Sequence, residues 1–245
     1  MDTHFPPVLR QLMGEERRSG DDYFDKATKE AAAICGRSQG ASAAAKETEP
    51  INRKERARFS AAVKPAEEEA LIAHACESGL WVEEKTFVDK YQSRKIGEGA
   101  EQKVFLAEDG VTVLKLNAAI YHYTWLDYFN RLLMHSFLFP ATRYDLVGFT
   151  LDNGMLAAIT RQQFAILDKG ASREIIEHHL QTHGFVRIKN DDYYSAKLGV
   201  LLEDLHDENI FLYEEQNILF IDPVVYFETK DMNLGGNSVF IFPFK

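Results

Sequence analysis

The chain contains little cysteine and little positive charge, and both shortages narrow what it can be. The 2 cysteines, Cys35 and Cys76, have no metal-ligand spacing, so the sequence indicates neither a disulfide framework nor a zinc module. This usage is typical of a reducing, cytoplasmic compartment. With 28 Lys and Arg against 38 Asp and Glu, the formal net charge is −10. That balance argues against nucleic acid as a main partner, because a phosphate backbone needs a basic surface.

The sequence also lacks the long apolar runs of targeting and membrane segments. The beginning, MDTHFPPVLRQ, has no apolar core of the kind that signal peptides need. The most apolar run, at 123–139, carries Asp127, Asn130, Arg131 and His135. We therefore interpret that run as a buried helix rather than a membrane span. A length of 245 residues leaves room for one domain with an extension, or for two small domains.

Composition changes near residue 65. The segment 35–64 is rich in Ala, Ser and charge and has few large apolar residues, which predicts a linker or a loosely ordered stretch. We expect one helix before it, over 21–35, with Asp21 or Asp22 as cap and Gly36 as terminator. A second helix is expected from Pro65 to Gly79. These features predict a helical, partly disordered extension over 1–64 and a main domain over 65–245.

The main domain should mix strands and helices. From residue 81 the pattern is strand-like, and turn signals at Asp109-Gly110 and 152–154 predict two hairpins. Helices are expected over 117–139, with Asn117 as cap, and over 172–184. A final strand cluster contains KLGVLLEDL, NIFLYEE, QNILFID and SVFIFPF. This order predicts an α+β fold with two lobes, at about 81–162 and about 168–245.

Polar residues interrupt the final strand cluster in LLEDLHDENIFLYEEQNILFIDP, at 201–223. Carboxylate and amide oxygens suit Mg²⁺, so Asn209 and Asp222 on adjacent strands could share one ion. Asp204 would remain to accept a proton from a hydroxyl nucleophile. The alternative is a set of turn residues that cap loops. That alternative explains each residue singly, but it does not explain their spacing.

A glycine pair and a strand lysine precede this cluster. Gly97 and Gly99 can bring backbone N–H groups close to an anion, because no Cβ blocks the approach. Two glycines at this spacing are equally typical of an ordinary turn. Lys115 lies on the second strand of the first hairpin, opposite Leu114 and Leu116 by alternation. A strand lysine is usually solvated, but beside a glycine-rich hairpin it can reach phosphates.

Taken together, these segments resemble the protein kinase-like superfamily over residues 92–228. GEGAEQKV looks like the glycine-rich loop, with Gln102 where a third glycine is usual, and VLK looks like the strand-lysine motif. DLHDEN looks like the catalytic loop of small-molecule phosphotransferases. IDP looks like the metal-binding segment, with Pro223 and Val224 replacing Phe and Gly. The stretch 131–154 is also similar to the minimal kinase domains of polyvalent proteins from bacterial mobile elements.

The resemblance implies a two-lobed minimal protein kinase-like fold with a reduced C-terminal lobe, and a phosphotransferase that uses ATP and Mg²⁺. It also implies a role for each motif residue. Gly97, Glu98 and Gly99 would cover the phosphates, and Lys115 would pair with the α- and β-phosphates. Asp204 would be the base, and His206 would contact the transferring phosphoryl group. Asn209 and Asp222 would bind Mg²⁺.

The chain departs from the kinase pattern in ways that keep other functions open. The helix after Lys115 has no glutamate, and Asp127 is its only acid. Leu202-Glu203 replaces the usual His-Arg, and the chain after Asp222 is too short for a full activation segment and a large helical lobe. We therefore expect a minimal kinase with an unidentified protein or small-molecule acceptor. The alternatives are a pseudokinase that serves as a nucleotide-binding or scaffold module, and a kinase-fold enzyme that transfers AMP.

Three histidines on the predicted helix over 172–184 suggest a metal site. His179 and His183 are four residues apart and can share a helical face, with His178 beside them. No acid completes an H-E-x-x-H pattern, so a surface or capping role is favoured.

Overall fold

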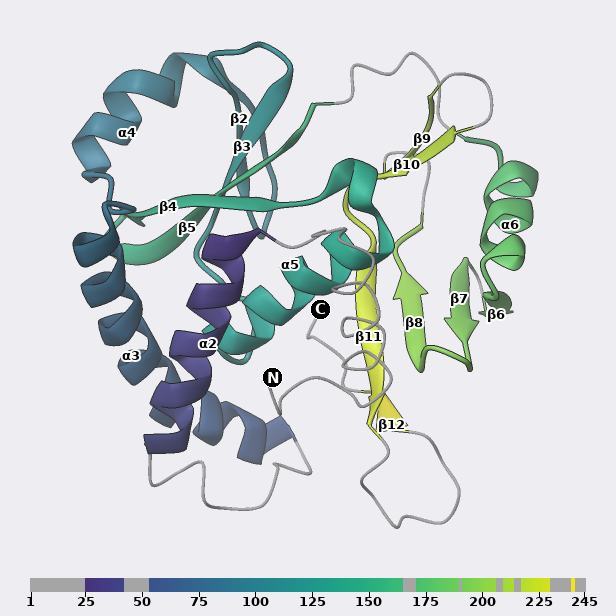
Figure 1. Cartoon of the computed structure of the whole chain (residues 1–245), viewed down its shortest axis with the longest axis horizontal. Coiled ribbons are helices and arrows are strands. Elements are labelled where there is room, and N and C mark those ends of the chain that lie inside the picture. The colour runs from purple at the N-terminus through teal and green to yellow at the C-terminus, as the bar shows by residue number, and fades with distance from the viewer. Residues whose placement is uncertain are drawn as a thin grey trace. The chain divides into compact units, whose positions relative to one another are not determined.

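The structure is a computed structural model that describes residues 25–41, 53–164, 171–189, 191–205, 209–213, 217–229 and 239–240. The chain forms two compact units. The N-terminal unit comprises the described residues of 23–137 and 143–165, and the C-terminal unit comprises 138–142 and those of 166–243. Helices and strands occur in both, so the predicted α+β class is confirmed (Figure 1). No helix in the described ranges has the length and apolarity needed to cross a bilayer.

The N-terminal unit is built on an antiparallel sheet with the strand order β1-β2-β3-β5-β4. Both predicted hairpins are confirmed, with β2 paired to β3 and β4 paired to β5. Their turns contain Gly110, Asn153 and Gly154 at φ values of 70°, 53° and 80°, which tight hairpin turns require. The strands are β1 Lys95–Glu98, β2 Lys103–Leu106, β3 Thr112–Asn117, β4 Asp145–Asp152 and β5 Met155–Gln163.

Helices cover both faces of this sheet. Phe87 of α4 (Glu84–Tyr91) packs in one apolar cluster with Phe105, Leu114 and Leu116. On the opposite face, Phe129 of α5 (Trp125–Leu138) contacts Phe149 of β4, with ring centroids 6.1 Å apart. Helix α4 was not expected, because residues after 81 were interpreted as strand-like.

Helix α5 begins later than the sequence suggested. Asn117, the predicted cap, is instead the last residue of β3, and its Oδ1 accepts a hydrogen bond from the Ala119 N–H at 2.7 Å. Thr124 performs the capping, since its Oγ1 accepts the Asp127 N–H at 3.0 Å. The predicted end before Pro140 is confirmed. The start was wrong because Asn serves equally well in turns and at helix caps.

Helices α2 (Lys26–Ala41) and α3 (Arg53–Ser78) precede the sheet and belong to the same unit. The expectation that a helix starts at Pro65 is wrong, since Pro65 lies inside α3. A buried stripe at four-residue spacing runs through that point and holds the helix in register despite the lost hydrogen bond. The stripe consists of Val63, Glu67, Leu71 and Ala75.

Helix α2 also differs from its expected bounds. It continues past Gly36, where the sequence suggested an end, because packing against α3 supports its last turns. Ser38 Oγ donates to the Ala66 carbonyl at 3.1 Å. Asp25 caps the helix by accepting the Thr28 N–H at 2.8 Å; the expected caps at 21–22 lie outside the described residues.

The C-terminal unit contains a second antiparallel sheet, ordered β12-β11-β8-β7-β6, and a separate β9–β10 hairpin. The helix expected between Ser172 and Gly184 is confirmed as α6 (Arg173–Thr182). Strand β11 was not anticipated, because it follows directly on the IDP segment. The strands are β6 Val186–Lys189, β7 Asp192–Ser195, β8 Val200–Glu203, β9 Ile210–Tyr213, β10 Asn217–Phe220, β11 Val224–Thr229 and β12 Val239–Phe240.

The buried carboxylate of Glu67 connects α3 to α5. Its oxygens accept the Trp125 and Leu126 N–H groups at 2.8 and 3.2 Å and the Gln39 amide at 2.9 Å. The first turn of a helix has free N–H groups and a positive dipole end, so a carboxylate is favoured there. Burial nevertheless raises the pKa of the Glu67 carboxyl, and the hydrogen bonds offset only part of that effect.

We predict a pH signature for Glu67. Because its pKa is raised in the folded protein, the folded state holds the proton more tightly than the unfolded state does. Its contribution to stability is therefore complete at low pH and is lost as pH rises through the folded pKa. Urea unfolding at a series of pH values gives the free energy of unfolding of wild type and of Glu67→Gln. The difference, wild type minus variant, should decline as pH rises above the ordinary pKa range of glutamate. A difference that is flat or rises with pH would contradict this assignment.

Close backbone packing at Gly148 in β4 generates a second prediction. A Cβ at this position would lie 2.8 Å from the Leu80 carbonyl oxygen, which accepts the Phe149 N–H. Gly148→Ala should therefore lower the free energy of unfolding by about 1–3 kcal/mol, as overpacking does. Gly97→Ala is the matched control, since the nearest atom to its Cβ would be Val104 Cβ at 3.8 Å. Equal stability losses in the two variants would refute the steric explanation.

Candidate functional site

In the C-terminal unit, strand register brings Asp204 and Asp222 together in the fold. Glu203, the last residue of β8, is the Cα partner of Val224, the first residue of β11. Asp204 follows Glu203 directly, and Asp222 precedes Val224 by two residues. Because neighbouring antiparallel strands exchange direction, the end of one meets the start of the other. Two carboxylates that are distant in sequence therefore lie at one end of the sheet.

Asn209 ties the two acidic segments together. It stands at the base of the β9–β10 hairpin, where its carbonyl accepts the Ile221 N–H at 2.9 Å. Its Nδ2 lies 3.1 Å from the Asp204 carbonyl oxygen and 3.4 Å from that of Asp222. Carbonyl oxygens only accept, so the NH₂ group must face them. Oδ1 is then the side-chain atom of Asn209 that suits a hard cation.

Asp204 has an uncommon backbone conformation, with φ at 63°. Only Gly, Asn and Asp adopt the left-handed region readily, and other residues pay about 1–2 kcal/mol there. The side chain is exposed, whereas its neighbours Leu202 and Leu205 are buried. The chain thus presents Asp204 to solvent from an anchored backbone. The sequence does not reveal this turn, and His206 lies outside the described residues.

The N-terminal unit holds the other candidate residues. Gly97 and Glu98 belong to strand β1, which was expected to be loop, and Gly99 opens the connection to β2. The Gly99 N–H donates to the Gln102 carbonyl at 2.9 Å. Side-chain carbons at Gly97 and Gly99 would meet no protein atom closer than 3.8 and 4.0 Å, respectively. Packing within the unit therefore does not require glycine at either position.

Lys115 is buried, with 3% of its surface exposed, so the alternative of an ordinary solvated strand lysine does not apply. Alternation holds as predicted, since Leu114 and Leu116 lie in the cluster under α4 and Lys115 points to the other face. Its Nζ is 3.3 Å from the Tyr144 hydroxyl and 5.2 Å from the Tyr144 ring centroid. Burying an ammonium group requires such compensation. Sequence reasoning missed Tyr144, because it gives no local signal.

Asp127, the acid in the helix after Lys115, has partners near its own helix. Its Oδ2 lies 3.6 Å from His122 Nδ1 and 3.7 Å from Arg131. Burial would raise the pKa of the Asp127 carboxyl, but Arg131 and His122 outweigh burial and hold the pKa below its ordinary value. Burial lowers the pKa of His122. Asp127 therefore serves a charge network at the start of α5.

Of the three histidines, His183, which directly follows α6, has the expected capping role. His183 Nδ1 lies 2.8 Å from the His179 carbonyl oxygen at the end of the helix, and the two rings pack with centroids 4.4 Å apart. Within the described ranges, no group of three or more His, Cys, Asp or Glu residues could hold a metal ion. A metal at the Asp204–Asp222 junction would thus rely on one or two acidic ligands and on Asn209.

A pocket of about 480 Å³ lies between α4 and the sheet. Phe87, Leu114 and Ile159 form its apolar wall, and Lys90 and Arg161 stand among its polar residues. Lys115 points to the opposite face of the sheet, so this pocket is not the surroundings of the candidate lysine.

Comparison with known protein families gives a match over most of the chain. A family model described as "Serine/Threonine/Tyrosine Kinase found in polyvalent proteins" matches residues 64–229, more than half of the chain. The match spans every candidate residue named above. No curated protein and no solved structure matches the chain.

The role of Asn209 as a tie is testable. Asn209→Ala removes hydrogen bonds to two carbonyls, each worth about 0.5–1.5 kcal/mol. We expect faster amide hydrogen exchange at Leu205 and Ile221, measured by mass spectrometry on native protein. Asn153→Ala, in the β4–β5 turn, serves as a control that should leave these amides unchanged. Unchanged protection in Asn209→Ala would show that the side chain does not hold the two segments.

Proposed function

Because the chain belongs to the family of serine/threonine/tyrosine kinases found in polyvalent proteins, we propose that it transfers a phosphoryl group from ATP, with Mg²⁺, to a hydroxyl acceptor. The family supports a kinase-like phosphotransferase in general. The observation that carries the finer proposal is the junction where Asn209 bridges the backbones of Asp204 and Asp222. Phosphoryl transfer relies on positioning and charge neutralisation. The junction would position Asp204 beside the acceptor, and a metal ion held at Asp222 would neutralise charge.

In this proposal, Asn209 and Asp222 hold Mg²⁺ and Asp204 serves as the base. Mg²⁺ keeps several waters and takes one or two protein carboxylates together with phosphate oxygens. The donor set fits that preference, with the Asn209 Oδ1 and a carboxylate and without a cluster of three acids among the described residues. Asp204 is exposed, as a group must be that receives the proton of an incoming hydroxyl.

The N-terminal unit would bind the phosphates. Lys115 would pair with the α- and β-phosphates, and its burial supports this role because charge interactions strengthen away from water. Gly97, Glu98 and Gly99 would cover the phosphates through backbone N–H groups. The space at both glycines supports a ligand, rather than internal packing, as the reason for the missing side chains.

The proposal also covers His206, the two units, the acceptor and the cellular context. His206 would contact the transferring phosphoryl group, and the two units would serve as the lobes of a minimal kinase. The acceptor would be a protein or a small molecule. A cytoplasmic location agrees with the two free cysteines, and an origin in a mobile element would follow from the polyvalent family.

A pseudokinase is the second candidate, and one observation favours it. Asp127, the only acid on α5, is engaged by His122 and Arg131. An acid held in that network is less available to a nucleotide site, so nucleotide could bind without efficient turnover. An AMP transferase of the kinase fold is separated from both by the mass of the product, which carries AMP instead of phosphate.

We predict that two acidic substitutions have different effects. Asp222→Asn should weaken Mg²⁺-dependent ATP binding and turnover together, because it removes a metal ligand. Asp204→Asn should leave ATP binding intact and lower turnover by roughly 10²–10⁴, the range for loss of a general base. Asparagine tolerates the left-handed backbone of residue 204, so that change tests chemistry rather than folding. Binding is measured by calorimetry and turnover by ATP consumption with autophosphorylation.

The outcomes separate the candidates. ATP binding by wild type without turnover supports the pseudokinase, and an adduct with the mass of AMP supports the transferase. Full activity in Asp204→Asn would show that Asp204 is not the base. Failure of wild type to bind MgATP would overturn the proposed function.

A further inference from the structure

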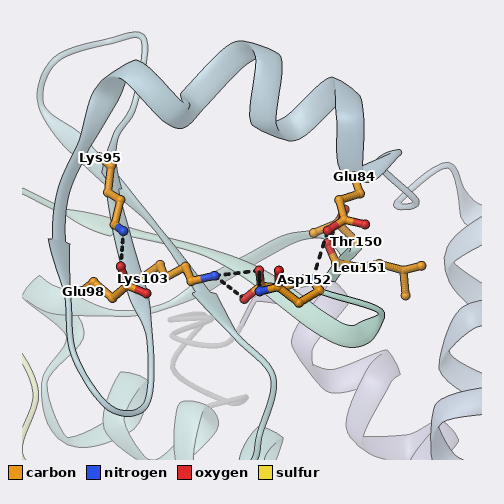
Figure 2. A network of polar contacts seen from close by, with 8 residues as sticks. Glu84, Lys95, Glu98, Lys103, Thr150, Leu151 and Asp152 are labelled. Atoms are coloured by element: carbon orange, nitrogen blue, oxygen red, sulfur yellow. Dashed lines mark hydrogen bonds and ion pairs between the residues drawn. The ribbon is translucent and has the colours of Figure 1, made fainter.

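A polar network joins the glycine-rich hairpin to the opposite end of its sheet (Figure 2). Lys103 is the first residue of β2, directly after the connection that Gly99 opens. Its Nζ lies 2.7 and 2.8 Å from the two carboxylate oxygens of Asp152, the last residue of β4. Their side chains are only 25% and 21% exposed, so solvent screens this pair less than it screens a surface pair.

The pair acts at the base of the glycine segment. Lys103 is the Cα partner of Glu98 across the β1–β2 ladder, and Glu98 pairs in turn with Lys95 (Figure 2). Strands β1 and β2 lie at one edge of the sheet and β4 at the other. The Lys103–Asp152 contact thus spans the sheet and fixes the hairpin from outside its own ladder.

The anchor at the β4 end is itself held. The Asn153 N–H donates to Glu84 Oε1 at 3.0 Å, and the Asn153 amide donates to Asp152 Oδ1 at 3.1 Å. Glu84 begins α4, and Phe87 of the same helix is buried in the core cluster. The contacts therefore run from the glycine segment through the β4–β5 turn to a helix that the core keeps in place.

We propose that Lys103 and Asp152 are positioning residues that hold the segment Gly97–Gly99 ready for the phosphates of a nucleotide. This inference rests on the proposed function for its ligand. Glycines give a segment more conformations than other residues do, and ordering them on binding costs free energy. A partly buried ion pair at the base of the segment reduces that cost before the ligand arrives, which is preorganisation.

The first test needs no nucleotide. Hydrogen exchange of the ligand-free protein should be faster at 97–102 in Lys103→Met and in Asp152→Asn than in wild type. Lys90→Met is the matched control, because Lys90 pairs with Glu108 at the same 2.7 Å but lies on α4. It should leave exchange at 97–102 unchanged. If residues 97–102 are equally protected in wild type, Lys103→Met and Asp152→Asn, the proposal is overturned, whatever ligand the protein binds.

The second test separates positioning from charge. Both single variants should weaken ATP binding by roughly 3- to 30-fold, as expected for partners coupled by about 0.7–2 kcal/mol. Adenosine, which has no phosphates, should bind equally to all forms. If Lys103 acted only as a positive charge near the phosphates, Asp152→Asn would instead strengthen ATP binding. The exchange variant Lys103→Asp with Asp152→Lys should recover most of the ATP affinity.

The two proposals fail in different ways. If wild type binds no ATP, the proposed function is overturned. Hydrogen exchange of the ligand-free protein still decides whether the Lys103–Asp152 pair orders the glycine segment. If wild type binds ATP and both single variants bind it with the same affinity, only the positioning role is overturned. Parallel loss of ATP and adenosine affinity would show general damage to the unit and would also contradict it.

Discussion

The register between β8 and β11 is the constraint on which the candidate site depends. Because Glu203 pairs with Val224, the residues just beyond the strands meet at one sheet end. A slip of one residue would turn every side chain of one strand to the other face. The buried residues of β8 and β11, including Leu202 and Val225, resist such a slip. The core of the C-terminal unit thus fixes the spacing of Asp204 and Asp222. Asn209 adds hydrogen bonds to the backbone carbonyls of both residues.

Buried charges organise the N-terminal unit in a comparable way. Glu67 fixes the start of α5 from α3, and Lys115 is held beside Tyr144 on the face of the sheet that α5 covers. Breaking one partner of a buried polar contact leaves the other unsatisfied, which is costly. Each contact therefore specifies one arrangement of the helix and the strand. The residues before 64, expected to be an extension, contribute α2 and the first turns of α3 to this arrangement.

Sequence reasoning succeeded where the signals are local. Turn residues gave both N-terminal hairpins and the end of α6, and alternation gave the face of Lys115. It failed where distant packing decides. The stripe from Val63 to Ala75 carries α3 through Pro65, and the burial of Lys115 depends on Tyr144, 29 residues away.

In the candidate site, too, local features could be predicted from the sequence and long-range ones could not. The identities of Asp204, Asn209 and Asp222 were visible from their spacing, whereas their assembly depends on long-range pairing. The left-handed conformation of Asp204 and the pairing of Lys103 with Asp152 have no sequence signature, because both arise from contacts between segments. The roles assigned to these residues stay predictions, and so does the function of His206.

Hydrogen exchange with increasing MgATP decides whether the glycine segment and the Asp204–Asp222 junction respond to one nucleotide, as proposed. Peptides covering 96–106 and 201–223 would be followed over the same titration. If the segment and the junction do so, both peptides gain protection with one common midpoint, and both lose it when Mg²⁺ is removed by chelation. Protection of only one peptide, or two different midpoints, would contradict the proposal.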